Sequence, residues 1–208
     1  MPCCRPLNSS TIIQDINNTE PGHYGFFFFD YKDAGKSTAG SLLSSLILQL
    51  SDQSKDLFDV LVGSYSSHGN NMKSPSLEAL TQYLEELLRV PQNVPIYLII
   101  DALDECPFTK EQSSPRRQVL TPVEKLVRLN LPNLRICVTS RPEPDIQATL
   151  GPLTSTSNII SLHDESGQKN DIVNFVRSEV QFYANLRRWR EEDKEFAIKT
   201  LSDKADGS

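Results

Sequence analysis

Three acidic residues at the end of an apolar run are the first candidates for chemistry in this sequence. Asp101, Asp104 and Glu105 follow residues 96–100, which read Ile-Tyr-Leu-Ile-Ile. Such a run is typical of a strand buried on both faces of a parallel sheet, and ligands bind at the carboxyl ends of these strands. One acid there would commonly be solvated, but neighbouring carboxylates repel one another unless a cation or a basic group lies among them. We expect that cation to be a hydrated magnesium ion carrying nucleotide phosphates.

The composition narrows the class of protein. The chain has 208 residues, of which 38% are hydrophobic and 23% are charged, as in a soluble globular protein with one full core. The formal net charge of −6 argues against a nucleic-acid groove. No apolar stretch approaches the roughly 20 residues of a membrane span, and the N-terminus lacks the apolar core of a secretion signal. We therefore expect a cytoplasmic protein, with Cys106 and Cys137 as reduced core thiols.

Strand-like and helix-like patterns alternate along the chain, which predicts a parallel sheet with helices on both faces. Pro122 should kink its helix or mark a fresh start, and residues 64–74 should form a loop. We expect residues 1–186 to form the core and residues 187–208 to begin a following helical segment. The predicted strands are 24–31, 96–100, 134–139 and 158–162, and the predicted helices are 8–16, 38–50, 55–62, 76–88, 116–129, 145–150 and 171–186.

A nucleotide site with this acidic strand, the pattern called Walker B, also needs a loop that surrounds the phosphates. The expected pattern is G-x-x-x-x-G-K-[ST] between a strand and a helix. Gly35, Lys36 and Ser37 match its end, but Asp30 occupies the position of the first glycine. A carboxylate and a Cβ there would oppose the approach of an anion, and Asp33 adds a second negative charge. We therefore favour a helix-capping loop over a phosphate cradle, which stays the alternative.

Four segments stand in an order and spacing that resemble a known family: 9–16, 28–33, 101–106 and 138–146. The chain resembles the NACHT domain of fungal NOD-like-receptor proteins, in the variety described as nephrocystin-3-like N-terminal. The segments Asp-Ala-Leu-Asp-Glu-Cys and Thr-Ser-Arg-Pro-Glu make the resemblance specific. It implies a three-layer fold of the P-loop NTPase type, in the STAND class, with a parallel sheet and helices on both faces.

The resemblance places the phosphate loop just before residue 9. Arg5 then takes the position of the phosphate-binding lysine, Pro6 that of the magnesium-binding Ser or Thr, and Cys4 that of a glycine. Pro6 lacks both the hydroxyl and the N–H, and Cys4 lacks the torsional freedom of glycine. Arg5 is therefore the expected nucleotide contact of a degenerate loop. The first strand is expected to be missing, although a longer chain could carry it.

The resemblance also implies roles for the residues at the predicted strand ends. Asp101 would hold magnesium through water, and Asp104 or Glu105 would orient the attacking water. Arg141 takes the position of a sensor arginine that contacts the terminal phosphate. Its alternative role is a surface ion pair with Glu143 or Asp104.

Two functions from different classes follow. The first is a nucleotide-dependent signalling switch, in which ATP or GTP with Mg²⁺ controls self-association or contact with other protein domains, and slow hydrolysis resets the state. The second is a non-catalytic protein-interaction module, a remnant of the NACHT fold, which the degenerate Arg5-Pro6 segment favours. Hydrolysis by this chain is left open, and neither nucleic acid nor membrane is an expected partner.

Overall fold

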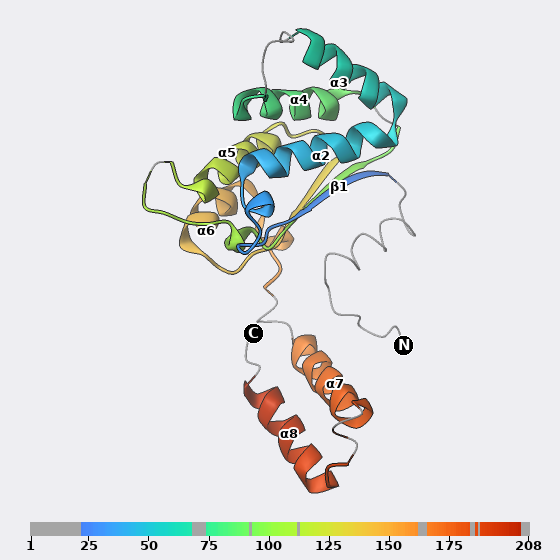
Figure 1. Ribbon diagram of the computed structural model, residues 1–208, viewed down its shortest axis with the longest axis vertical. Helices are drawn as coiled ribbons and strands as arrows, with labels where there is room; N and C mark the ends of the chain where they lie inside the picture. Colours follow the sequence, from blue (N-terminus) through green and yellow to red (C-terminus); the bar gives the residue numbers. More distant parts are fainter. Residues whose placement is uncertain are drawn as a thin grey trace. The chain divides into compact units, whose positions relative to one another are not determined.

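The structure is a computed structural model that describes residues 22–67, 74–91, 93–111, 113–161, 166–183, 186 and 188–204 (Figure 1). The described residues form two compact units that divide between Ser155 and Thr156. We call residues 22–155 the sheet unit and residues 156–204 the hairpin unit. The predicted helix 8–16 and Arg5 lie outside the described residues. The boundary predicted after residue 186 stays a prediction about domain organisation.

The described strands form one parallel sheet in the order β1-β2-β3, with β1 at His23–Phe28, β2 at Ile96–Asp101 and β3 at Leu134–Val138. Phe28 pairs with Asp101, and Ile100 pairs with Val138. The carboxyl ends of the three strands therefore meet at one edge of the sheet. The strands predicted at 24–31, 96–100 and 134–139 are confirmed within one to three residues at their ends.

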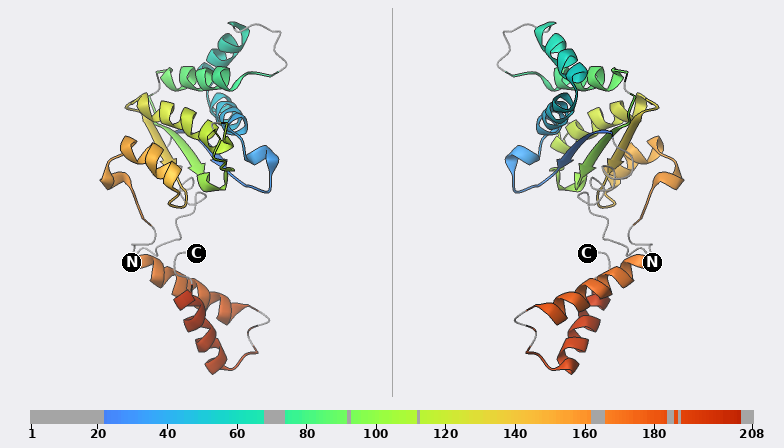
Figure 2. Two further views of the ribbon diagram at one scale, coloured as in Figure 1. Left: turned by 90° about the vertical axis from the view of Figure 1, so that its left-hand side faces the viewer. Right: turned by 90° about the vertical axis from the view of Figure 1, so that its right-hand side faces the viewer.

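Helices pack on this sheet. In Figures 1 and 2, α2, α4 and α5 stack on one side of it, as right-handed connections from β1 to β2 and from β2 to β3 require. α2 contacts β1, α3, α4 and α5. The α/β fold class, a parallel sheet flanked by helices, is thus confirmed. The helices of this unit are α2 (Ala39–Gln53), α3 (Lys55–Ser67), α4 (Leu77–Arg89), α5 (Pro115–Arg128) and α6 (Pro144–Leu150), with short turns η1 (Ala34–Lys36), η2 (Leu103–Glu105) and η3 (Gly151–Leu153).

The core of the sheet unit lies between β2 and the apolar stripe of α2. β2 is the central strand, and its Leu98 and Ile100 are fully buried. α2 comes so close to β1 that a Cβ at Gly25 would lie 3.0 Å from Leu46 Cδ2. The predicted apolar stripe of α2 is confirmed, because each of its members is at most 4% exposed: Leu42, Leu43, Leu46, Ile47 and Leu50.

Two glutamines of α2 close the outer edge of β1. The Gln49 amide accepts from Phe26 N–H at 3.1 Å and donates to Phe26 O at 2.8 Å. The Gln53 amide does the same with Tyr24, at 2.9 and 2.6 Å. Four residues of helix rise about 6 Å and two residues of strand rise about 6.6 Å, so the two spacings match. The two side-chain amides thus bond backbone N–H and C=O groups of β1 that could otherwise pair with another strand.

Two local predictions were wrong, and a third is narrowed. Helix α3 continues to Ser67, so the loop predicted at 64–74 begins later, since the Ser64 hydroxyl is satisfied within the helix by Val60 O. α5 runs without interruption through the buried Pro122, so no fresh start occurs there, and the predicted kink stays a prediction. The described part of the strand predicted at 158–162 is not a strand. Ile159 and Ile160 there are 55% and 69% exposed, and no described strand lies alongside to pair with them.

The hairpin unit contains the short turn η4 (Thr156–Asn158) and two helices, α7 (Ser166–Phe182) and α8 (Glu191–Lys204). The two helices pack on each other, and each has one buried aliphatic residue, Val180 in α7 and Ile198 in α8, which are 3% and 4% exposed. The helix predicted at 171–186 corresponds to α7, which begins and ends earlier than expected. None of the described helices has the length and apolar character needed to cross a membrane.

Candidate functional site

Asp101 and Thr139 meet where the carboxyl ends of β2 and β3 lie side by side. The Thr139 hydroxyl donates a hydrogen bond to the Asp101 carboxylate and accepts one from Ala102 N–H at 3.0 Å. Ala102 adopts the left-handed conformation, with φ of 54°, and Leu103 N–H donates to Thr139 O at 3.0 Å. The chain thus turns sharply after Asp101, and Thr139 fixes both the turn and the carboxylate. No role was expected for Thr139 from the sequence, although its place at the end of a predicted strand was a signal.

The three acids do not converge. Asp104 and Glu105 lie in η2, and Asp104 turns toward the segment after β3. Its carboxylate accepts from Arg141 N–H at 3.0 Å and lies 3.5 Å from Arg141 Nε. The Asp104 side chain is 13% exposed, whereas that of Arg141 is 84% exposed. The alternative role of Arg141, an ion pair with Asp104, is therefore present in the structure, and its sensor role stays a prediction.

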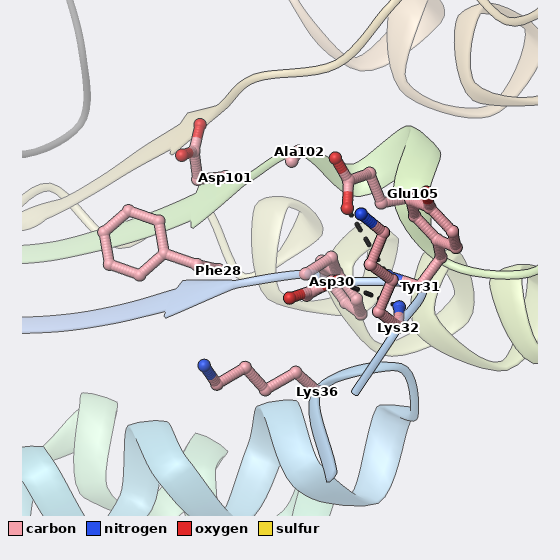
Figure 3. A pocket seen from close by; sticks show the side chains of 9 residues that line it. Phe28, Asp30, Tyr31, Lys32, Lys36, Asp101, Ala102 and Glu105 are labelled. Atoms are coloured by element: carbon pink, nitrogen blue, oxygen red, sulfur yellow. Dashed lines mark hydrogen bonds between the residues drawn. The ribbon is translucent and has the colours of Figure 1, made fainter. Parts of the chain in front are cut away.

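Glu105 lines an open pocket between the ends of β1 and β2 (Figure 3). Its carboxylate accepts a hydrogen bond from Tyr31 N–H at 3.4 Å. The pocket has a volume of about 410 Å³ and combines carboxylates with two lysines. Figure 3 shows Lys36 on the opposite side of β1 from Asp101 and Glu105. The lining residues are Phe28, Phe29, Asp30, Tyr31, Lys32, Lys36, Asp101, Ala102 and Glu105.

The Gly35-Lys36-Ser37 segment is a capped turn. The Asp33 carboxylate accepts from Gly35 N–H at 2.8 Å, and Asp33 O accepts from Lys36 N–H at 2.8 Å. Asp30 likewise accepts from Lys32 N–H at 2.9 Å. Asp30 and Asp33, the acids that depart from the phosphate-loop pattern, thus accept hydrogen bonds from backbone amides that would otherwise be free to bind a phosphate. The helix-capping interpretation is confirmed for this loop.

A buried arginine supports the loop that carries the acids, and the sequence analysis missed it. Arg116, in the first turn of α5, is only 7% exposed. Its Nε donates to Cys106 O at 2.9 Å and its Nη2 to Asp104 O at 2.5 Å. A cation in the first turn of a helix opposes the helix dipole, so its position was the signal that acidic or carbonyl partners would be near.

The same guanidinium reaches the start of α6. Arg116 Nη1 lies 3.3 Å from Asp145 Oδ1 and 3.8 Å from Glu143 Oε2. The Phe108 ring covers the guanidinium, at 5.5 Å from Cζ to the ring centroid. Arg116 therefore joins the loop after β2 to the turn after β3.

Comparison with known families places the chain in one of them. The family model described as Nephrocystin 3, N-terminal, matches residues 6–141, which is more than half of the chain. The chain belongs to the nephrocystin-3 N-terminal family. The matched range includes all three acids, Arg116 and Arg141. This nephrocystin-3 N-terminal chain matches no curated protein and no solved structure.

The described residues of this nephrocystin-3 N-terminal chain contain no group of three His, Cys, Asp or Glu side chains that could hold a metal ion. The divergence of Asp101, Asp104 and Glu105 explains this. Magnesium commonly keeps several waters and binds through one or two carboxylates plus substrate phosphates. The predicted role of Asp101, contact with magnesium through water, is of that kind and stays a prediction.

Both described cysteines are free thiols, as the sequence predicts. Cys106 is fully buried and its Sγ donates to Ser37 O at 3.4 Å. Burial raises the pKa of Cys106 from 9.0 to about 11, although the Arg116 charge acts in the opposite direction. Burial, helped by the Asp101 charge, also raises the pKa of Cys137. Neither thiol has the lowered pKa of a reactive cysteine.

Proposed function

We propose that this chain is the core of a nucleotide-dependent signalling switch of the NACHT type, with a P-loop NTPase fold. The observation that carries the proposal is the meeting of Asp101 and Thr139 at the carboxyl edge of a parallel sheet. Ligands of open α/β sheets bind at this edge. An open pocket that contains Lys32 and Lys36 adjoins Asp101 and supplies positive charge for phosphates.

Magnesium with ATP or GTP fits the donor set at this edge. Asp101 receives the Thr139 hydroxyl, and a carboxylate has about four lone-pair sites, so it retains capacity for a water of a hydrated magnesium ion. The metal would supply positive charge to the phosphates when bound. Thr139 keeps the carboxylate oriented. Arg5 remains the expected contact of the degenerate loop.

Glu105 suits the water-orienting role better than Asp104. Its carboxylate lines the pocket, whereas Asp104 is engaged by Arg141. Arg141, 84% exposed, could transfer its guanidinium from Asp104 to an incoming phosphate, while the Asp104 carboxylate, 13% exposed, would keep the hydrogen bond from Arg141 N–H. The nucleotide state would thereby change the contact between the loops after β2 and β3.

The second candidate is a protein-interaction module that uses no nucleotide. The Asp104–Arg141 pair and the Lys36–Asp33 pair, 3.8 Å apart, favour it, since these charges already neutralise one another. In that case Asp101, Asp104 and Glu105 only stabilise the fold.

The test is the molar mass of the full chain in solution with MgATP, MgADP or MgCl₂ alone. The switch predicts a larger species with MgATP that returns to the smaller mass with MgADP. Asp101→Asn should abolish the response, whereas Asp52→Asn, at an exposed position of α2, should keep it. A mass that is the same in all three solutions would favour the interaction module.

A further inference from the structure

Arg116 reaches two segments that come together at the candidate site. We infer that Arg116 is a positioning residue, which holds the loop after β2 and the turn before α6 as one unit and so sets where Asp104 and Arg141 lie. Its consequence for nucleotide binding rests on the proposed function, whereas its effect on the two segments does not.

Three hydrogen bonds from Arg116 hold the loop that contains the acids. The side chain donates to Asp104 O and Cys106 O, and the backbone N–H donates to Pro107 O at 3.0 Å. These acceptors are carbonyls of η2 and of the loop that follows it, and the sheet ladder does not satisfy them. The position of Glu105, which lies between two of them, is therefore fixed by α5.

The other edge of the guanidinium holds the turn before α6. Nη1 faces Asp145 in the first turn of α6 and Glu143 at its N-cap. The Asp104 carboxylate adds a second link, since it binds both the backbone and the side chain of Arg141. Asp104, Arg116 and the segment 141–145 thus form a closed circuit of polar contacts.

The two links differ in how easily they break. Arg116 is 7% exposed, so loss of its partners would leave a buried charge uncompensated, which is strongly destabilising. The Arg141 side chain is 84% exposed, so its guanidinium can be solvated when it leaves Asp104, and Asp104 keeps the hydrogen bond from Arg141 N–H. Arg116 is therefore the fixed link and Arg141 the releasable one.

Lysine cannot replace this arginine. The guanidinium directs planar N–H groups to two carbonyls along one edge and to carboxylates along the other, while its face lies on Phe108. An ammonium group is a single point of charge with no such fork. The positive charge of a lysine alone should therefore not hold both the loop after β2 and the turn before α6.

Amide hydrogen exchange of the full chain tests the inference. In Arg116→Met, peptides covering 102–108 and 139–146 should exchange at least about tenfold faster than in the wild type, because the carbonyls of one segment and the carboxylates of the other lose their shared donor. Peptides of α2 and β1 should keep their rates. Arg116→Lys should resemble Arg116→Met, and the exposed neighbour Arg117→Met should resemble the wild type.

Glu143→Gln with Asp145→Asn keeps the inference testable if the Arg116 variants do not fold. This variant should speed exchange at 139–146 but not at 102–108, because Arg116 still holds the carbonyls there. Uniformly faster exchange throughout the chain, or wild-type rates in Arg116→Lys, would overturn the inference.

Binding of a fluorescent ATP analogue separates this inference from the proposed function. Binding by the wild type that weakens in Arg116→Met but not in Arg117→Met supports both. If the wild type binds no nucleotide while the local exchange pattern holds, the proposed function fails and the positioning role stands.

Discussion

Single side chains decide which way each acid points. Ala102 is left-handed, so the chain turns between Asp101 and the next two acids, and their carboxylates leave in different directions. Thr139 holds Asp101, Arg141 holds Asp104, and Tyr31 N–H meets Glu105. The sequence alone indicates three like charges that need a cation. The structure satisfies each charge separately, so a metal ion is not required to hold the loop together.

Cys106 gives a prediction for the dependence of stability on pH. Its pKa is raised in the folded chain, from 9.0 to about 11, so the thiol favours folding while it is protonated. This contribution is fully present below pH 9 and should be lost as the pH rises from 9 to 11. We expect the loss to reach about 2 kcal/mol in the free energy of unfolding, measured by urea denaturation.

Cys106→Ala is the control for that measurement. This substitution should lower the free energy of unfolding at every pH because it leaves a cavity. Between pH 9 and 11, the free energy of unfolding of the variant should fall less steeply than that of the wild type. Parallel curves for the two proteins would contradict the assigned pKa.

At the scale of helices and strands, α2 is held to β1 by amides as well as by apolar packing. Gln49 and Gln53 lie four residues apart and meet alternate residues of the strand. They therefore fix the register between helix and strand, which leucine packing alone would allow to slide. The same pairs protect an edge of the sheet from other strands.

Replacing these glutamines should reveal both effects. Gln49→Leu should lower the free energy of unfolding by about 1–3 kcal/mol, because its bonds are partly buried and the groups left behind lose their partner. Gln53→Leu should cost less, since its bonds are exposed. The double variant should also scatter light at concentrations where the wild type does not.

Gln82→Leu is the matched control, since Gln82 makes an exposed bond to Glu86 within α4. Gln82→Leu should lower the free energy of unfolding by less than Gln49→Leu does, and the variant protein should not aggregate. Equal losses for Gln49→Leu and Gln82→Leu would contradict the edge-closing role.

The parts of the fold that local sequence determines were predictable. The apolar run at 96–100 and the leucine stripe of α2 each carry their own signal, because burial of these residues follows from their type and spacing. Residues 158–161, Asn-Ile-Ile-Ser, also have the composition of a strand, yet a strand needs a neighbouring strand to pair with. Arg116 could not be placed from sequence, since its partners come from 104, 106, 143 and 145 and meet only in the folded chain.

At the scale of the whole molecule, we propose that the carboxyl edge of the sheet binds magnesium and nucleotide through Asp101. The parallel sheet brings Asp101 and Thr139 together at this edge, whereas in the Gly35-Lys36-Ser37 loop the Gly35 amide is already bound by Asp33. A direct titration is therefore the decisive step.

That titration is calorimetry of MgATP and MgGTP into the full chain and into Asp101→Asn and Thr139→Val. We predict saturable binding of at least one nucleotide by the wild type. Affinity should fall at least about tenfold in Asp101→Asn, and by less in Thr139→Val, which keeps the carboxylate but frees its orientation. Removal of magnesium with EDTA should weaken the wild type and leave Asp101→Asn nearly unchanged. No heat of binding at millimolar nucleotide from a folded wild type, or equal affinity in Asp101→Asn, would contradict the account.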